Sequence, residues 1–319
     1  MSSEPVRTDS GKSDAEENLS SRPAGPNLLR QRERTVDNIK WLFAYVFAIS
    51  FTMAAKNVFD AAEPMLRGAT MPALGFWPYL GALLVFTVTA SVFYHQGAKF
   101  FDWRYASGIN DEANRLGFVI DFATLVVTMI PFMLMANSLV KTVTSAVGLT
   151  AFVYGYIWLV GGGLIWLLLF EVRHSQWFRN RLNENLAKLE LQRDKSVRTY
   201  WFGLNGTIFI ILSLGFVIAR HYGDACPAKP GAGFPFFLLF FAIIAVVRDA
   251  LDFFWVWPVL YPVAPSDRRF IWPMTYLMSE GMTTARWPRA LGISIAVVAV
   301  VIGFRQGLFN YADLVRACI

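Results

Sequence analysis

Seven long apolar stretches, separated by short polar breaks, constrain this chain more than any other feature of its sequence. They run over residues 39–59, 76–94, 116–138, 148–170, 200–219, 235–259 and 290–309. An α-helix needs about 20 apolar residues to cross a hydrocarbon core of about 30 Å. Only 16% of the residues are charged, whereas soluble domains average about a quarter. The pattern therefore predicts an all-α polytopic transmembrane helix bundle with about seven spans.

The first 37 residues differ in composition from the rest of the chain. They are rich in charged residues, Ser, Gly and Pro and contain no aromatic residue. Such a segment cannot bury enough apolar surface to fold, so residues 1–37 are predicted to be a disordered tail. Residues 38–310 are predicted to form the transmembrane domain and 311–319 a short tail. The first apolar run begins only near Ile39, so no cleaved signal peptide is expected.

The distribution of basic residues predicts the orientation. If the amino terminus is cytoplasmic, the cytoplasmic segments hold about three times as many Lys and Arg residues as the opposite side. This bias predicts a cytoplasmic amino terminus and an extracytoplasmic carboxyl terminus. The net charge of +6 is thus interpreted as a topology signal and not as a nucleic-acid site. Without a signal peptide, the expected location is a bacterial inner membrane.

A helical extension is predicted on the cytoplasmic side at residues 171–200. The sequence has no Gly or Pro from Leu164 to Phe202, and apolar residues recur at helical spacing from Phe178 to Leu189. Span four is therefore expected to continue as a helix and to turn near residues 193–195. Its amphipathic surface could pack on a neighbouring helix, lie on anionic lipid headgroups or dock a membrane-protein partner, which includes a second copy of the chain.

Four charged residues lie where the bilayer is expected. Arg248, Asp249 and Asp252 interrupt the sixth apolar stretch, and Asp121 lies near the start of the third. Arg248 and Asp252 are four residues apart and share a helical face, whereas Asp249 needs a partner on another helix or in a hydrated cavity. An ionisable group within a bilayer is costly unless it is paired or hydrated. We expect these residues to form one cluster, which is either an ion or solute pathway or an interhelical ion-pair network.

A second polar group follows the second apolar stretch. His95, Lys99 and Asp102 recur at spacings of four and three residues, so a continued helix would place them on one face at the cytoplasmic mouth. They could pass protons towards Asp121, or they could be an ordinary boundary at which long side chains reach the interface.

The two cysteines, Cys226 and Cys318, are both predicted on the extracytoplasmic side, where disulfides form. They could form a disulfide or be two free thiols, because the sequence gives no distance between them. Three scattered His residues and these two cysteines indicate no metal site, and no cofactor is predicted. No zinc-protease, phosphate-loop or serine-hydrolase motif is present, so no enzyme class is indicated.

Two segments resemble other proteins. The sequences FYHQGAKFFDWRY and RDALDFFWVWPVLYP are similar to patterns in uncharacterised bacterial multi-span integral membrane proteins. This resemblance covers about a tenth of the chain, implies a helical membrane fold and carries no activity.

Three functional hypotheses follow. The first is a channel or transporter for a small ion or solute, with Asp121, Asp249 and Asp252 along the path and Arg248 as their countercharge. The second is a structural or regulatory subunit of a larger membrane complex, because residues 171–200 are amphipathic and catalytic motifs are absent. The third is an enzyme acting on lipid-linked substrates, for which no nucleophile can be named.

Overall fold

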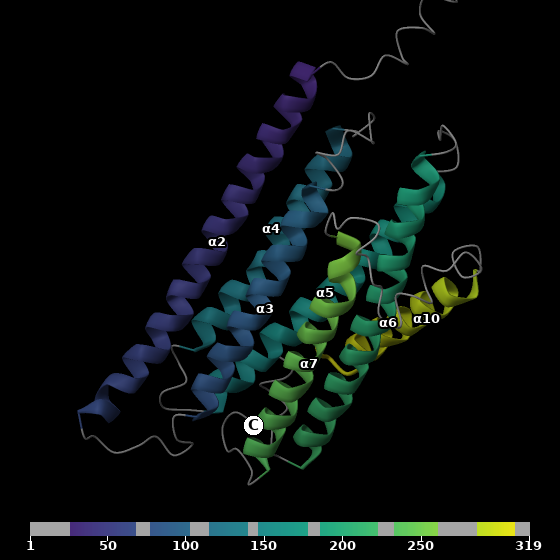
Figure 1. Ribbon diagram of the computed structural model, residues 1–319. Coiled ribbons are helices and arrows are strands. Elements are labelled where there is room, and N and C mark those ends of the chain that lie inside the picture. The colour runs from purple at the N-terminus through teal and green to yellow at the C-terminus, as the bar shows by residue number, and fades with distance from the viewer. Residues whose placement is uncertain are drawn as a thin grey trace, which may run out of the picture.

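The structure is a computed structural model that describes residues 26–67, 77–102, 115–139, 146–177, 186–222, 233–260 and 286–309. These residues form seven helices and no strand. The helices are α2 (Pro26–Leu66), α3 (Trp77–Phe101), α4 (Arg115–Ser138), α5 (Ala146–Trp177), α6 (Leu186–His221), α7 (Phe234–Leu260) and α10 (Trp287–Arg305). Figure 1 shows the long helices side by side, with α2 at one edge of the bundle and α10 at the other.

Six of these helices are long and apolar enough to cross a membrane, namely α2, α3, α5, α6, α7 and α10. Within α4, the segment Val126–Ser138 is a shorter apolar stretch. Large apolar side chains point outward on the helices, as Trp41, Phe236 and Val301 do with 75%, 75% and 57% of their surface exposed. Exposed apolar surface on this scale requires lipid around it and not water. The chain is therefore a helical integral membrane protein, while the seventh span and the orientation stay predictions.

Cross-helix contacts show how the helices alternate in direction. Lys40, in the first half of α2, pairs with Asp102, directly after α3. Glu171, near the end of α5, pairs with Arg198 and Arg289, in the first halves of α6 and α10. We call the end of the bundle that carries these five residues the charged end. It is the end that the basic residues predict to be cytoplasmic.

The predicted boundary of the amino-terminal tail is wrong in part, because α2 begins at Pro26 and includes residues 26–37. Proline suits the first turn of a helix, since its missing N–H would have no helical partner there. The inner face of α2 also extends into the predicted tail, because Val36 is buried one turn before Ile39. Residues 1–25 lie outside the described part of the chain.

The turn predicted near residues 193–195 is also wrong, because α6 runs unbroken from Leu186 to His221. Helix α5 ends at Trp177, so both helices extend beyond their apolar stretches at the charged end. Residues 178–185 between them are not described. A run without Gly or Pro gave no signal for the position of the turn.

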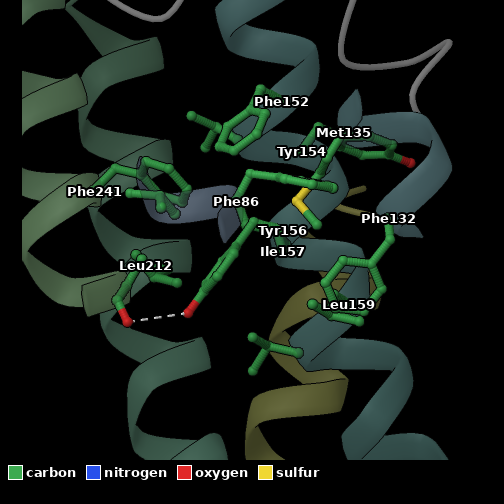
Figure 2. Packing of buried hydrophobic residues seen from close by; sticks show 14 of the residues in the cluster. Phe86, Phe132, Met135, Phe152, Tyr154, Tyr156, Ile157, Leu159, Leu212 and Phe241 are labelled. Carbon is green, nitrogen blue, oxygen red and sulfur yellow. Dashed lines mark hydrogen bonds between the residues drawn. The ribbon is translucent and has the colours of Figure 1, made fainter. Parts of the chain in front are cut away.

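An aromatic core fills the middle of the bundle. Figure 2 shows Phe86, Phe132, Met135, Phe152 and Phe241 directed towards one another around Tyr156. The ring centroids of Tyr156 and Phe241 lie 5.2 Å apart in an edge-on arrangement, and those of Phe86 and Phe132 lie 6.2 Å apart. Edge-on aromatic pairs add favourable electrostatics to the packing. The same core includes Phe43 of α2 and Phe202 of α6, which follow Lys40 and Arg198 by three and four residues, so it extends towards the charged end.

Small residues bring α10 against α6. The buried residues of α10 are Pro288, Gly292, Ala296, Ala299 and Gly303, which recur every three or four positions and form one face. Helices with small residues at the interface can approach until their backbones touch. A β-carbon at Gly292 would lie 3.1 Å from the carbonyl oxygen of Thr199 on α6. The close approach fixes how α6 is rotated, and so which of its side chains face α7.

Candidate functional site

The structure places Arg248, Asp249 and Asp252 of α7 inside the bundle, with 3%, 0% and 0% of their surface exposed. The Nη2 atom of Arg248 lies 3.1 Å from Oδ2 of Asp252, one helical turn later. The Nη1 atom donates to Oδ1 of Asp249 over 2.7 Å. One guanidinium thus lies between two carboxylates, and we call these three residues the α7 cluster.

Helix α6 supplies two further groups to the α7 cluster. The side-chain oxygen of Asn205 accepts hydrogen bonds from Nε and Nη2 of Arg248, over 3.0 and 2.9 Å. The indole N–H of Trp201 donates to Oδ1 of Asp252 over 2.8 Å. Asn205 and Trp201 are four residues apart, so they lie on the same face of α6. Buried charges need such hydrogen bonds, because the bilayer offers no water to replace them.

Helices α3 and α5 also contribute side chains to the surroundings. The Thr89 hydroxyl of α3 donates to Oδ2 of Asp249 over 2.5 Å, and the Phe93 ring lies 4.9 Å from the guanidinium carbon of Arg248. A cation above an aromatic face is attracted by the ring quadrupole. The Tyr156 hydroxyl of α5 donates to the carbonyl oxygen of Ala245, one turn before Asp249 (Figure 2).

The α7 cluster does not balance its charge. It holds two carboxylates and one guanidinium, and the described side chains that hydrogen-bond to it are neutral, namely Thr89, Trp201 and Asn205. With both Asp residues ionised, the cluster carries one excess negative charge at a fully buried position. Such a charge costs several kcal/mol in a bilayer unless a cation or a proton balances it.

A polar face of α3 leads from this cluster to the charged end. Thr89, Gln96 and Lys99 are spaced so that they lie on one side of the helix. His95 precedes Gln96, and the buried residue Val92 lies between Thr89 and Gln96. From Thr89 to Lys99 the helix rises by about 15 Å. The His95 ring also lies 6.5 Å from the ring of Phe253, the residue that follows Asp252 on α7.

At the charged end, the predicted mouth residues form an ion-pair network that includes α2. Asp102 lies 2.5 Å from Nζ of Lys40 and 3.7 Å from Nζ of Lys99. Lys40 also lies 2.9 Å from Asp37. In the described part of the chain, these ion pairs join two Lys and two Asp side chains, all of them partly exposed. They tie α2 to α3 beside the polar face, and His95 lies one turn further into the bundle.

A second buried charge group was not predicted from the sequence. The carboxylate of Glu171 on α5 contacts Arg289 of α10 and lies 3.1 Å from Nη1 of Arg198 on α6. Glu171 and Arg198 are 8% and 5% exposed. Glu171 and Arg198 each lie directly beside an apolar stretch, so the sequence suggests only charged residues at the membrane boundary. They are buried because α5, α6 and α10 meet at this point.

The structure leaves three predicted residues without a described side-chain environment. Asp121 belongs to α4, but its side chain lies outside the described part of the structure, so its place in the cluster is not tested. Cys226 and Cys318 lie in segments that are not described, and the disulfide stays a prediction. Among the residues that were described, no three His, Cys, Asp or Glu side chains group to hold a metal ion.

Sequence reasoning missed the neutral partners of the α7 cluster. Asn205 and Thr89 stand in apolar stretches, where a polar residue is itself a signal, because it needs an interhelical hydrogen bond. Trp201 stands at the start of an apolar stretch, where a tryptophan usually marks the membrane interface. Each of the three lies on a helix other than α7, so their convergence could not be read from spacing.

Comparisons of the chain with models of protein families, with curated proteins and with solved structures find no match.

Proposed function

We propose that this chain is an ion-transporting integral membrane protein and that the α7 cluster lies on its path. One observation carries the proposal: two carboxylates share a single guanidinium at a fully buried position in an apolar helix. A purely structural network would be expected to be neutral, because an uncompensated charge is costly in a bilayer. A net negative site instead favours a transported cation.

The position of the cluster supports the same proposal. Polar residues of α3, namely His95, Gln96 and Lys99, lie between the level of Thr89 and the charged end. A transporter alternates between two states, and packed aromatic side chains such as those of the core can adopt two arrangements.

Ion flux into liposomes tests the proposal. The purified full chain is reconstituted, and the fluxes of H⁺, Na⁺ and K⁺ are recorded under an imposed membrane potential. Flux of at least one of these cations is expected. The double variant Asp249→Asn/Asp252→Asn should lower that flux by about tenfold or more, because a factor of ten needs only about 1.4 kcal/mol. The triple variant that adds Arg248→Met should lower it equally.

A matched control uses the same chemical change at an exposed position. Asp60 pairs with Lys56 on α2, and both side chains are more than half exposed. Asp60→Asn should therefore leave the flux unchanged. Absence of flux for all three cations, or unaltered flux in the double variant, would contradict the proposal. A stable complex with other proteins in gently extracted membranes, detected by native mass spectrometry, would instead favour a subunit of a larger assembly.

A further inference from the structure

Arginine side chains gather where α5, α6 and α10 meet at the charged end. Glu171 of α5 contacts Arg289 of α10 through Oε1 and Arg198 of α6 through Oε2. Arg286, directly before α10, lies three residues before Arg289. Glu171 thus divides its two oxygens between guanidinium groups of two helices, and it holds the Arg289 side chain in place. A ligand that binds Arg289 therefore does not have to order this side chain.

Arg289 keeps hydrogen-bond donors that Glu171 does not use. A guanidinium group carries five N–H donors in a planar fork. Arg289 contacts Glu171 through Nη2, and within the described part of the chain Glu171 is its one ion-pair partner. The Arg289 side chain is 31% exposed, against 6% for the side chain of Arg198. The open donors of Arg289 are therefore within reach of a ligand at the bundle surface.

Arg286 lies beside Arg289 at the same surface. Arg286 is exposed, its side chain makes no capping hydrogen bond, and it pairs with no carboxylate among the described residues. Residues three apart on a helix are neighbours, with β-carbons about 5–6 Å apart. Guanidinium groups bind phosphate oxygens through paired N–H donors, so two that lie this close can bind one phosphate together. We call Arg286 and Arg289 the arginine pair.

The arginine pair lies at the level of the lipid headgroups. The apolar span of α10 begins at Trp287, which is 53% exposed, and an exposed tryptophan at the end of a span marks the membrane interface. Further along α10, Ala290, Val297 and Val301 follow Arg286 at helical spacing, and all three are exposed. An apolar surface thus leads from the arginine pair into the hydrocarbon core.

We infer that the arginine pair binds the phosphate of an anionic phospholipid, with one acyl chain along the exposed face of α10. Charge complementarity and the adjoining apolar surface select this ligand, because a free phosphate uses only the arginines and a hydrocarbon only the apolar surface. The charged end is predicted to be cytoplasmic, and the cytoplasmic leaflet is the anionic one. The bound lipid holds the start of α10 at its junction with α5 and α6. This site is separate from ion transport, so either proposal can fail without the other.

Native mass spectrometry of the purified full chain in detergent micelles tests the inference. Phosphatidylglycerol, which is anionic, and phosphatidylcholine, which is zwitterionic, are added in separate titrations. Phosphatidylglycerol should bind more tightly. Arg286→Gln should weaken its binding about fivefold and Arg286→Gln/Arg289→Gln about 25-fold, because one basic residue near an anionic lipid surface contributes about a factor of five in affinity.

Arg305→Gln is the matched control, because Arg305 is an exposed arginine in the last turn of the same helix, beside the exposed residue Phe304. It should leave the binding unchanged. Arg286 forms no ion pair in the described part of the chain, so Arg286→Gln tests the site even if the double variant does not fold.

Three results would overturn the inference: equal binding of the two lipids, unaltered binding in Arg286→Gln, or the same loss in Arg305→Gln as in Arg286→Gln. Displacement of phosphatidylglycerol by an equal concentration of inorganic phosphate would also overturn it, because the site would then take a free phosphate ion and not a lipid.

Discussion

Replacing Arg248 by Met is expected to destabilise the protein by about 3–5 kcal/mol, because it leaves two buried carboxylates without their common cation. Asp249 would keep its bond from Thr89, and Asp252 its bond from Trp201. Neither of those neutral donors replaces a guanidinium. The free energy of unfolding is measured in detergent micelles. The fraction of the protein that stays monodisperse on heating is a second measurement.

The matched control removes all three charges together. In the variant Arg248→Met/Asp249→Asn/Asp252→Asn no buried charge remains, so most of the lost stability should return. Replacing a buried ion-pair network by neutral residues of similar volume is often neutral or stabilising. If Arg248→Met alone is as stable as the unmodified chain, Arg248 does not stabilise the two buried carboxylates, and the ion pairs of the α7 cluster are wrong.

Replacing Gly206 by Leu is expected to have the second large effect, a loss of about 3 kcal/mol in the free energy of unfolding. A β-carbon at this position would lie 2.8 Å from Cγ2 of Ile295 and 3.2 Å from the backbone nitrogen of Ala296 on α10. The Ile295 side chain could rotate away from the new side chain, but the backbone nitrogen of Ala296 can move only if α10 moves. The two helices would have to separate, which can be measured as an earlier unfolding transition in micelles.

Gly203, one turn before Gly206 on α6, offers the control. A β-carbon there meets no atom within 4 Å, and alanine favours a helix over glycine by about 1 kcal/mol. Gly203→Ala should therefore be neutral or stabilising, whereas Gly206→Ala should destabilise. Equal effects of the two alanine variants would mean that α10 does not pack against α6 as described.

The α7 cluster illustrates the limits of prediction from sequence. Spacing alone indicates that Arg248 and Asp252 can meet on one helical face and that Asp249 points elsewhere. It does not indicate that Thr89 approaches Asp249 or that Asn205 approaches Arg248, because these contacts join residues 160 and 43 positions apart in the chain. Such contacts depend on the rotation of α3 and α6 about their own axes. A single sequence carries little information about that rotation.

Packing supplies that information in the structure. On α10 the buried face consists of small residues, among them Gly292 and Ala296, and it fits against Gly206 of α6. The resulting position of α6 turns Trp201 and Asn205 towards α7. The sequence contains these glycines, but it does not show which neighbouring helix each of them faces.

By itself the sequence determined the class of the protein, a helical membrane bundle, because each apolar stretch must satisfy its backbone hydrogen bonds within one helix in lipid. It also showed that Arg248, Asp249 and Asp252 interrupt an apolar stretch. Only the tertiary structure decided that one guanidinium is shared by two carboxylates and that Glu171 joins three helices. The physical reason is that helical periodicity acts within one segment, whereas the relative rotation of two helices is set by the fit of their side chains.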